Sequence, residues 1–389
     1  MGKDLIVSAE KARRALVAVH GFLPGSRPRG KAGALAVARR MQVIQSDPVD
    51  IAGRNHDLTL QSRVDDYKRQ YLDELLYEDR KLFEYYCKMA SVMPLELYPV
   101  FNEMRNKFSK RYAPFFKEHA KEMRHVLKEL KGGEVSSRDF KSDKKVDYWG
   151  KTQVYRVLLE RLFICGRVLI HHREAGVKYY SLAEDVVPDR FLKEKGPRGA
   201  EFKRAVALMI CNASRLASPN RAPEQWWEVG KTQEVEKVLS QLERNGKLFS
   251  LAIEGWKGKC YAPAEDEAVW ADPPEPEEEY ARFLAPLDPL LWNRRLFAKV
   301  YGNEYTWEVY KQEKDRKYGY YCLPVIHNGD YAALIEPWYD KKEKKLEIRG
   351  FHVLGTKTDK RRLKKAVAGE LDRFAEYLGA GKVVARLLK

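Results

Sequence analysis

The sequence predicts an α+β fold in which helix-hairpin modules precede a β-rich C-terminal part. Residues 152–182 and 232–263 share one order of elements: a helix with apolar residues at helical spacing, a glycine, a strand, a basic turn and a second strand. Residues 318–338 instead hold two alternating runs joined by Asn328-Gly329, a dipeptide suited to a type I′ hairpin because both residues tolerate positive φ. The chain length of 389 residues predicts about two to three domains.

The first predicted elements are helices. Ser8 is a suitable N-cap for a helix over residues 9–22, which the stretch PGSRPRGKAG ends. A second helix, residues 34–41, leads into a short strand. Residues 64–130 are rich in aromatic residues and have a mainly helical pattern interrupted by prolines, and Gly132-Gly133 supplies the stop.

The two helix-hairpin segments resemble each other. Aligning Gly166 with Gly246 pairs Leu159 with Leu239 and Leu162 with Leu242. A helix followed by a hairpin with a basic tip is the outline of a winged-helix module, whose helix can enter a DNA groove and whose wing can contact phosphate or the minor groove. The same outline occurs in winged helices that bind proteins, and the basic charge of this chain favours DNA.

In the last hundred residues the sequence pattern changes from helix-hairpin segments to a series of strands followed by a helix. A third strand, KLEIRGFHVLG, follows the charged turn DKKEKK, so the C-terminal strands form a three-stranded meander. Residues 358–378 then form a helix with a basic start, TDKRRLKKAV, which is unfavourable for the helix dipole. Such a start indicates either phosphate contact or a solvated basic face.

The charge of the chain points to a polyanionic partner. Lys and Arg exceed Asp and Glu by 72 to 56, which gives a net charge of +16, and the sequence pI is about 9.4. Nucleic acid is the first candidate for such a partner. Residues 261–280 are the exception, since they hold eight acidic residues and no Lys or Arg. We interpret this stretch as a linker or an edge that repels DNA, or more simply as a solvated surface loop.

Several classes of protein are excluded by what the sequence lacks. Its five cysteines are far apart and never in a C-x-x-C spacing, which fits reduced thiols and a cytoplasmic, nucleoid-associated protein. The chain has no signal peptide pattern and no run of eighteen apolar residues, so we expect no membrane span. The phosphate-binding, zinc-protease and serine-hydrolase motifs are missing. The adjacent His171-His172 lie on a predicted strand, where neighbours point to opposite faces, so we expect no metal site and no cofactor.

Two polar residues precede Pro48 in the stretch VIQSDPVD. If residues 43–47 are extended, Gln45 and Asp47 leave the backbone on the same side. The simplest interpretation is that Gln45 is an exposed strand residue and Asp47 caps the turn that begins at Pro48. The cations that follow would lie beside this carboxylate and beside a phosphate backbone: Arg54, His56 and Arg63.

The same stretch, VIQSDPVDIAGRNHDLTLQSR, resembles the motif region of the winged-helix DNA glycosylases of the AlkZ and YcaQ (AlkX) type, whose signature is Q-x-Q or Q-x-D. Similar blocks follow in the family's order: LFEYYCKMASVMPLELYP, YWGKTQVYRVLLERLFICGRVLI, EGWKGKCY, FLAPLDPLLWNRRLFAKVYGNEYTWEVY and RKYGYYCLPV. The chain departs from the family at Ser46, where an apolar residue is usual, at Lys88-Met89, where His-Glu is common, and in ALIEPWYDKKEKK.

The resemblance implies three winged-helix modules in a C-shaped arrangement with a β-rich C-terminal part. The expected divisions are a first winged-helix module with the Q-x-D strand (1–65), a helical segment (66–133), a second module (134–190), a third module (191–263), an acidic linker (264–283) and the C-terminal meander with its helix (284–389).

The resemblance also implies a reaction. It predicts a monofunctional DNA glycosylase that hydrolyses the N-glycosidic bond of N7-alkylated guanine, unhooks interstrand crosslinks and has no tight base-flipping pocket. By match of motif, Gln45 and Asp47 are catalytic. Because N7 alkylation already places positive charge on the purine, no general acid is needed. We expect Asp47 to polarise water and offset the charge of an oxocarbenium-like sugar, and Gln45 to orient the water.

The expected partner is double-stranded DNA that carries alkyl lesions or crosslinks, with no obligate protein partner. The Asn328-Gly329 hairpin is a candidate for probing the minor groove. In addition to the cations near Asp47, we predict DNA contacts for a set of basic residues along the modules: Lys151, Lys178, Lys231, Lys257, Arg294, Arg316 and Lys317.

Two other functions fit parts of this pattern. A winged-helix transcriptional regulator would bind DNA without catalysis and leave Gln45 and Asp47 structural. We find no heptad run or effector segment that would support it. A protein-interaction scaffold would need no affinity for DNA, which the charge excess disfavours.

Overall fold

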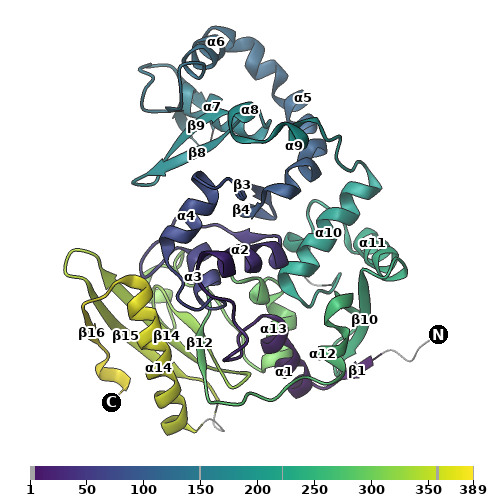
Figure 1. Cartoon of the computed structure of the whole chain (residues 1–389), viewed down its shortest axis with the longest axis vertical. Helices are drawn as coiled ribbons and strands as arrows, with labels where there is room; N and C mark the ends of the chain where they lie inside the picture. Colours follow the sequence, from purple (N-terminus) through teal and green to yellow (C-terminus); the bar gives the residue numbers. More distant parts are fainter. Residues whose placement is uncertain (1–4, 149, 221, 356–358, 389) are drawn as a thin grey trace. The chain divides into compact units, whose positions relative to one another are not determined.

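The computed structural model describes residues 5–148, 150–220, 222–355 and 359–388. These residues form two compact units (Figure 1). The first contains the described residues up to Leu72 and those from Val206 onward, and the second runs from Asp73 to Ala205. The chain leaves the first unit within helix α4 (Arg69–Tyr77) and returns to it within helix α10 (Ala200–Ser214). Helices and strands alternate in both units, so the predicted α+β class is confirmed.

The first unit is built on a five-stranded sheet. Its strands lie in chain order: β12 (Ala281–Phe283), β13 (Leu323–His327), β14 (Asp330–Asp340), β15 (Lys345–Val353) and β16 (Lys382–Val384). Neighbours are antiparallel except for β15 and β16, which are parallel. The predicted meander forms its middle, with φ of 47° at Asn328 and 93° at Gly329 in the turn. The two edge strands were not predicted, because three residues are too few to show alternation.

Helix α14 (Lys360–Leu378) packs on this sheet (Figure 1), with the rings of Phe374 and of Phe283 in β12 5.5 Å apart. Its basic first turn has a carboxylate cap, because Asp359 Oδ1 accepts hydrogen bonds from the backbone amides of Arg361 and Arg362 at 2.9 and 3.1 Å. Such a cap offsets the unfavourable charge at the helix start, so no phosphate is required there. Residue 358, where the predicted helix began, lies outside the described residues.

A helix-hairpin module also belongs to the first unit. Helix α11 (Thr232–Arg244) precedes β10 (Leu248–Ile253) and β11 (Cys260–Pro263), and β1 (Leu5–Val7) joins β10 as a parallel third strand. The other regular elements of the unit are α1 (Ala9–Val19), α2 (Gly30–Met41), β2 (Ile44–Gln45), α3 (Asn55–Gln61), α12 (Glu267–Ala271) and α13 (Arg294–Tyr301).

The acidic stretch is an ordered part of the first unit. Residues 264–283 contain a 3-10 turn, helix α12 and strand β12. Trp270 is fully buried, and Asp266 is paired with Arg215 at 3.1 Å. A stretch with this burial is anchored along its length, unlike a free linker.

The second unit contains the other helix-hairpin module. Helix α7 (Val154–Ile164) precedes β8 (Val168–Glu174) and β9 (Val177–Leu182), and β5 (Val135–Ser136) pairs with β9. The remaining elements are β3 (Leu82–Cys87), β4 (Met89–Pro94), α5 (Asn102–Glu118), α6 (Ala120–Glu129), β6 (Lys145–Asp147), β7 (Lys151–Gln153), α8 (Ala183–Val186) and α9 (Asp189–Lys193).

The pattern over residues 64–130 predicted helices throughout, but β3 and β4 form an antiparallel hairpin within it. From Phe83 to Cys87 the residues alternate between buried and partly buried, which is the period of a strand.

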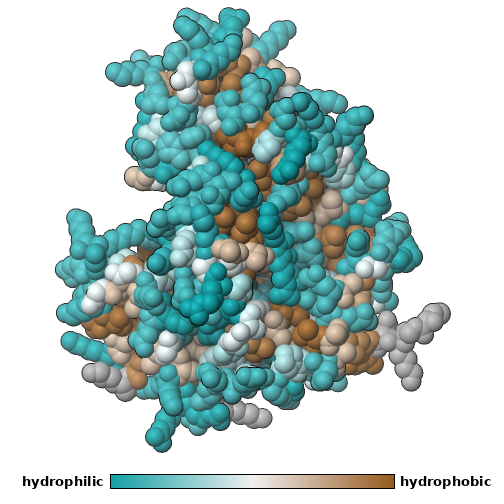
Figure 2. All heavy atoms as spheres, in the orientation of Figure 1, coloured by the Kyte–Doolittle hydropathy of each residue, from teal (hydrophilic) through white to brown (hydrophobic). Residues whose placement is uncertain are grey.

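Each unit keeps its apolar residues inside. The face in view is largely hydrophilic (Figure 2), in agreement with a mean hydropathy of −0.57. Within the described part of the chain, no helix has the length and apolar character needed to cross a bilayer.

Candidate active site

Gln45 and Asp47 lie at the end of strand β2 and just beyond it. Gln45 is 6% exposed, whereas Asp47 is partly exposed in the irregular segment that leads to α3. Because the strand stops at Gln45, the expected alternation does not reach Asp47. Asp47 Oδ1 accepts a hydrogen bond from the Val49 amide at 2.9 Å, so one carboxylate oxygen holds the turn after Pro48. Its Oδ2 has no hydrogen-bond partner among the described residues.

Two neighbouring carboxylates have a different environment. Asp50 accepts hydrogen bonds from Arg69 and Lys341, both at 2.8 Å. Asp57 is completely buried and is paired with Arg54 at 2.5 Å and with Arg69 at 3.3 Å. By contrast, no Lys, Arg or His of the described residues forms an ion pair with Asp47. Of these three carboxylates, Asp47 is therefore the one whose charge is not balanced within the protein.

The pKa shifts follow the same division. Burial raises the pKa of Asp47, and the hydrogen bond from Val49 offsets only part of this effect. Burial acts in the same direction on Asp50 and Asp57, but the cations around them outweigh it, so the pKa of each is lowered. A positively charged group placed beside Asp47 would therefore stabilise its ionised form.

Helix α3 positions the strand that carries Gln45. Asn55, at its first turn, donates from Nδ2 to the carbonyl oxygen of Gln45 at 2.7 Å and accepts from the Leu287 amide at 2.8 Å. One step further along, Ser46 Oγ lies 3.2 Å from His56 Nδ1. Ser46 therefore attaches the motif to α3 by a polar contact.

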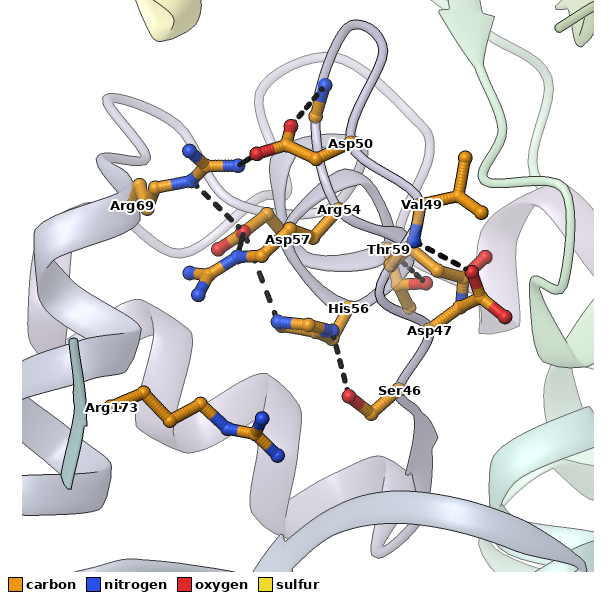
Figure 3. A network of polar contacts seen from close by, with 12 residues as sticks. Ser46, Asp47, Val49, Asp50, Arg54, His56, Asp57, Thr59, Arg69 and Arg173 are labelled. Atoms are coloured by element: carbon orange, nitrogen blue, oxygen red, sulfur yellow. Dashed lines mark hydrogen bonds and ion pairs between the residues drawn. The ribbon is translucent and has the colours of Figure 1, made fainter. Parts of the chain in front are cut away.

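Asp57 is the centre of the network in Figure 3. In addition to its two arginines, it accepts a hydrogen bond from the Tyr67 hydroxyl at 2.7 Å. Arg69 connects it to Asp50, and Asp47 points away from this group, toward Val49 (Figure 3). Asn55 and Asp57 were not predicted as functional residues, although a short helix in which five of seven residues are polar signals that some of them are buried and paired.

Two of the predicted DNA contacts are interior residues. Arg63 is 2% exposed, and its guanidinium makes two hydrogen bonds to Asp288 at 2.7 and 2.8 Å and a contact of 3.0 Å to His20. His56 is 7% exposed and faces Ser46 and Asp57. Burial of this kind does not fit direct contact with DNA, so both residues support the fold of the motif instead. Arg54 is partly exposed, and its Nε is committed to Asp57.

The other predicted contacts lie at or near the surface. Lys231, Lys257, Arg294 and Lys317 are exposed, and none of them forms an ion pair with another described residue. Lys151 is exposed and pairs with Asp147 at 3.1 Å.

The remaining two are partly exposed. Lys178 pairs with Glu160 at 3.1 Å, while Arg316 lies over the ring of Tyr320 at 4.7 Å and donates to the carbonyl of Lys311. These contacts reduce the positive charge that each residue offers to a phosphate.

The Asn328-Gly329 turn has an acidic setting. Asn328 Oδ1 accepts from the Tyr280 amide at 3.0 Å, and Asp330 pairs with Arg13 at 2.8 Å. The turn lines a hollow of about 470 Å³ together with five residues of the acidic stretch, 275–279. Three arginines also line the hollow and pair with three of its carboxylates: Arg13 with Asp330, Arg14 with Glu275 and Arg362 with Glu279. Six carboxylates against three arginines leave the lining net acidic, which disfavours a phosphate backbone at this turn.

The adjacent histidines do not point to opposite faces as expected. A β-bulge at His171 shifts the pairing of β8 with β9, so that the Nδ1 atoms of His171 and His172 lie 2.9 Å apart. Glu134 brings a carboxylate oxygen within 4.8 Å of both. These donors could accept a divalent cation. Arg80, which donates to the carbonyl of His171 at 2.9 Å, places a positive charge beside them that opposes one.

Comparison with known proteins agrees with the fold and with the predicted family. A model of the DNA glycosylase AlkZ-like family matches residues 38–377. The structure of the Streptomyces sahachiroi DNA glycosylase AlkZ superposes with a TM-score of 0.62 at 15% sequence identity, over 98% of this chain and 100% of that one. The predicted resemblance and enzyme class are confirmed, whereas the number of winged-helix modules stays a prediction. Since the family match covers most of the sequence, including Gln45 and Asp47, the chain belongs to the AlkZ-like DNA glycosylases.

Proposed function

We propose that this glycosylase hydrolyses the N-glycosidic bond of N7-alkylated guanine in duplex DNA, with Asp47 and Gln45 as its catalytic residues. The observation that carries the proposal is the contrast among three carboxylates: Asp50 and Asp57 are balanced by cations, and Asp47 is not. A protein keeps an unbalanced, half-buried carboxylate at a cost in stability, and such groups are common where charge develops during a reaction.

The chemistry of this lesion matches the carboxylate. As the bond between C1′ and N9 breaks, its electron pair goes to the purine and neutralises the charge that N7 alkylation had placed there. The sugar becomes an oxocarbenium-like cation, which an ionised Asp47 stabilises. Water then bonds to C1′ and gives its proton to the carboxylate or to solvent. The products are the free base and an intact strand with an abasic site, so no amine nucleophile is needed.

Gln45 has a supporting role in this scheme. Its backbone is held by Asn55 at 2.7 Å, next to the turn that Asp47 caps. An amide can donate to the attacking water and accept from it at once, which orients the water without changing its charge. We therefore assign Gln45 to water orientation and Asp47 to charge stabilisation and proton acceptance.

The finer substrate range follows from the same chemistry. A crosslink between two N7 atoms is also attached to cationic purines, so its unhooking needs the same bond cleavage. Asp47 is partly exposed, and an enzyme that reacts at a partly open site does not have to enclose a bulky adduct in a tight pocket. We include interstrand crosslinks among the proposed substrates on this ground.

A duplex oligonucleotide with one N7-methylguanine tests the proposal. After incubation and alkaline cleavage at abasic sites, wild-type protein gives strand breaks and Asp47→Asn gives none above the spontaneous level. Asp50→Asn is the matched control, because it removes the same charge three residues away from a cation-paired position. A second duplex with a nitrogen-mustard crosslink tests unhooking. Release at the wild-type rate by Asp47→Asn would falsify the assignment. The absence of release from both substrates would mean that this glycosylase acts on a lesion other than N7-alkylated guanine.

A further inference from the structure

A loop of aromatic residues approaches the Asp47 segment from another part of the first unit. This aromatic loop, residues 302–322, connects α13 to β13. The ring centroids of Tyr310 and Trp307 are 5.6 Å apart, and those of Trp307 and Tyr321 are 6.2 Å apart. Trp307 and Tyr321 are 8% and 1% exposed, whereas Tyr310 is 81% exposed. The three rings thus form a series that begins in the core and ends in solvent.

The loop is held in shape by a buried carboxylate. Glu308 is 3% exposed and accepts hydrogen bonds from the backbone amides of Lys317 and Tyr318, at 3.0 and 2.8 Å, and from the ammonium of Lys311 at 2.8 Å. Burial opposes its ionisation, but these bonds outweigh burial and lower its pKa to about 2. The Lys311 amide also donates to the Glu308 carbonyl at 2.9 Å, which closes a turn with Tyr310 near its apex. Tyr310 is therefore presented by an ordered turn.

The series of rings leads to the catalytic segment. The Tyr321 hydroxyl donates to the carbonyl oxygen of Gly53 at 3.0 Å, and the Gly53 amide donates to Asp50 at 3.2 Å. The Asp47 charge adds to the larger effect of lost hydration in raising the pKa of the Tyr310 phenol. The most exposed ring of the loop thus belongs to a series of contacts that ends on the segment carrying the candidate catalytic carboxylate.

An exposed aromatic ring at this place suits the chemistry of the lesion. An N7-alkylated purine is flat and positively charged, and the face of an aromatic ring attracts planar cations. Stacking between a base and an aromatic side chain is also a common source of affinity in nucleic-acid sites. The attraction for a cation favours the alkylated base over neutral guanine, and stacking adds affinity for either base.

We propose that Tyr310 is a specificity-determining residue of this glycosylase, whose ring stacks on the alkylated purine while Asp47 acts at the sugar. The proposal rests on the function proposed above and adds the group that would recognise the leaving base. It also offers an alternative to a closed pocket, since one open stacking face can receive a base that carries a bulky adduct.

Three substitutions of Tyr310 distinguish the effect of its aromatic ring from the effect of side-chain size. Tyr310→Phe keeps the aromatic face, Tyr310→Leu keeps apolar contact without it, and Tyr310→Ala removes both. In single-turnover release of N7-methylguanine from a duplex, we expect Phe to keep the wild-type rate and Leu and Ala to slow release by about tenfold or more. Trp227→Ala is the control, because Trp227 is an aromatic residue outside the loop that is 54% exposed. We expect it to leave the rate unchanged.

Fluorescence of 2-aminopurine gives a readout that does not require catalysis. The probe is placed opposite an abasic-site analogue in a duplex, where it is unpaired and free to stack. Wild type and Tyr310→Phe should quench it, and Tyr310→Leu and Tyr310→Ala should not. Normal release of N7-methylguanine by Tyr310→Ala or Tyr310→Leu overturns the proposal whatever the fluorescence shows. If even wild type releases no base, the proposed function fails, and equal quenching by wild type and Tyr310→Ala then overturns the stacking role as well.

Discussion

Most polar residues around the Q-x-D motif form hydrogen bonds or ion pairs with one another, whereas the charge of Asp47 has no cationic partner among the described residues. Asn55, Asp57 and Arg63 are buried, and each makes contacts that hold α3 and β2 in place. Asp47 accepts the hydrogen bond from the Val49 amide through Oδ1, and its Oδ2 has no hydrogen-bond partner among the described residues. Buried polar groups that are fully paired serve the fold, whereas a group whose charge is left unbalanced is the better candidate for chemistry. This division gives separate predictions for the two kinds of residue.

The activity should depend on the ionisation of Asp47. Because burial raises the pKa of its carboxyl, the protonated form persists to a higher pH than for an exposed aspartate. The rate of N7-methylguanine release should therefore fall as the pH is lowered, and the fall should begin above the ordinary range of aspartate. Single-turnover rates across the acid range, corrected for spontaneous depurination, measure this. A rate that stays constant down to the ordinary aspartate range contradicts a role for the ionised form.

Loss of activity in Asp47→Asn should not come from unfolding. A carboxyl whose pKa is raised in the folded state contributes less stability once the pH exceeds that pKa. The neutral amide relieves this penalty and can still accept the Val49 hydrogen bond. We expect the thermal midpoint of Asp47→Asn at neutral pH to equal or exceed that of wild type. A clearly lower midpoint would assign Asp47 to the fold instead.

Arg63 should behave in the opposite way. Its buried pair with Asp288 bridges α3 and the turn before α13, and its removal leaves an unpaired carboxylate in the interior. Breaking such a pair costs about 3 to 5 kcal/mol. Arg63→Ala should therefore lower the free energy of unfolding by about that amount in urea titrations. If Arg63→Ala unfolds like wild type but binds DNA more weakly, the original prediction of a DNA contact is correct and the structural role is not.

At the scale of elements, the helix-hairpin modules were the most predictable part of the fold. The alignment of Gly166 with Gly246 is reproduced in the backbone, where φ is 69° at the first and 66° at the second. The paired leucines of α7 and α11 are all buried. Local patterns of this kind are readable because helix period, glycine and strand alternation lie within a few residues of one another.

Other elements depend on contacts that the local sequence does not reveal. Strand β1 pairs in parallel with β10, from which more than 240 positions separate it along the chain, and β16 is three residues long. The same holds at the site: the motif and its resemblance predict Gln45 and Asp47 as catalytic candidates, but the ion pair of Asp50 with Lys341 depends on the fold. The bulge at His171 likewise brings together two side chains that were expected to point to opposite faces.

The two equivalent glycines should differ in their tolerance of a side chain. Both have left-handed backbones, so an alanine at either costs about 1 kcal/mol of conformational energy. A Cβ at Gly246 would meet no atom within 4 Å, whereas at Gly166 it would overlap the side chain of Arg105. Arg105 is 5% exposed and is fixed by a hydrogen bond to the Tyr98 carbonyl at 2.6 Å, so it cannot move aside easily. Gly166→Ala should therefore be clearly the more destabilising, as measured by urea unfolding. Equal losses would indicate that Arg105 is mobile.

At the scale of the whole molecule, the net charge of +16 is the property that bears most directly on binding to DNA, because DNA is a polyanion. Most of the carboxylates near the motif are neutralised by arginines, so the excess resides in surface cations such as Lys231 and Lys257. Surface charge of this kind binds DNA without regard to sequence and releases counterions when it does so. We expect such binding to hold the enzyme on DNA, while the proposed site recognises the lesion.

The salt dependence of binding should identify the cations that contact phosphate. For a lesion-free duplex, the logarithm of the binding constant should fall linearly with the logarithm of the salt concentration, by about 0.9 for each phosphate neutralised. Lys231→Ala and Lys257→Ala should each reduce that slope by about 0.9 and weaken binding equally on all sequences, because these exposed ammonium groups have no ion pair among the described residues. Lys193→Ala, whose ammonium is paired with Asp189, is the matched control and should leave the slope unchanged. Fluorescence anisotropy over a series of salt concentrations measures all three. Unchanged slopes for Lys231→Ala and Lys257→Ala would show that other cations carry the DNA contact.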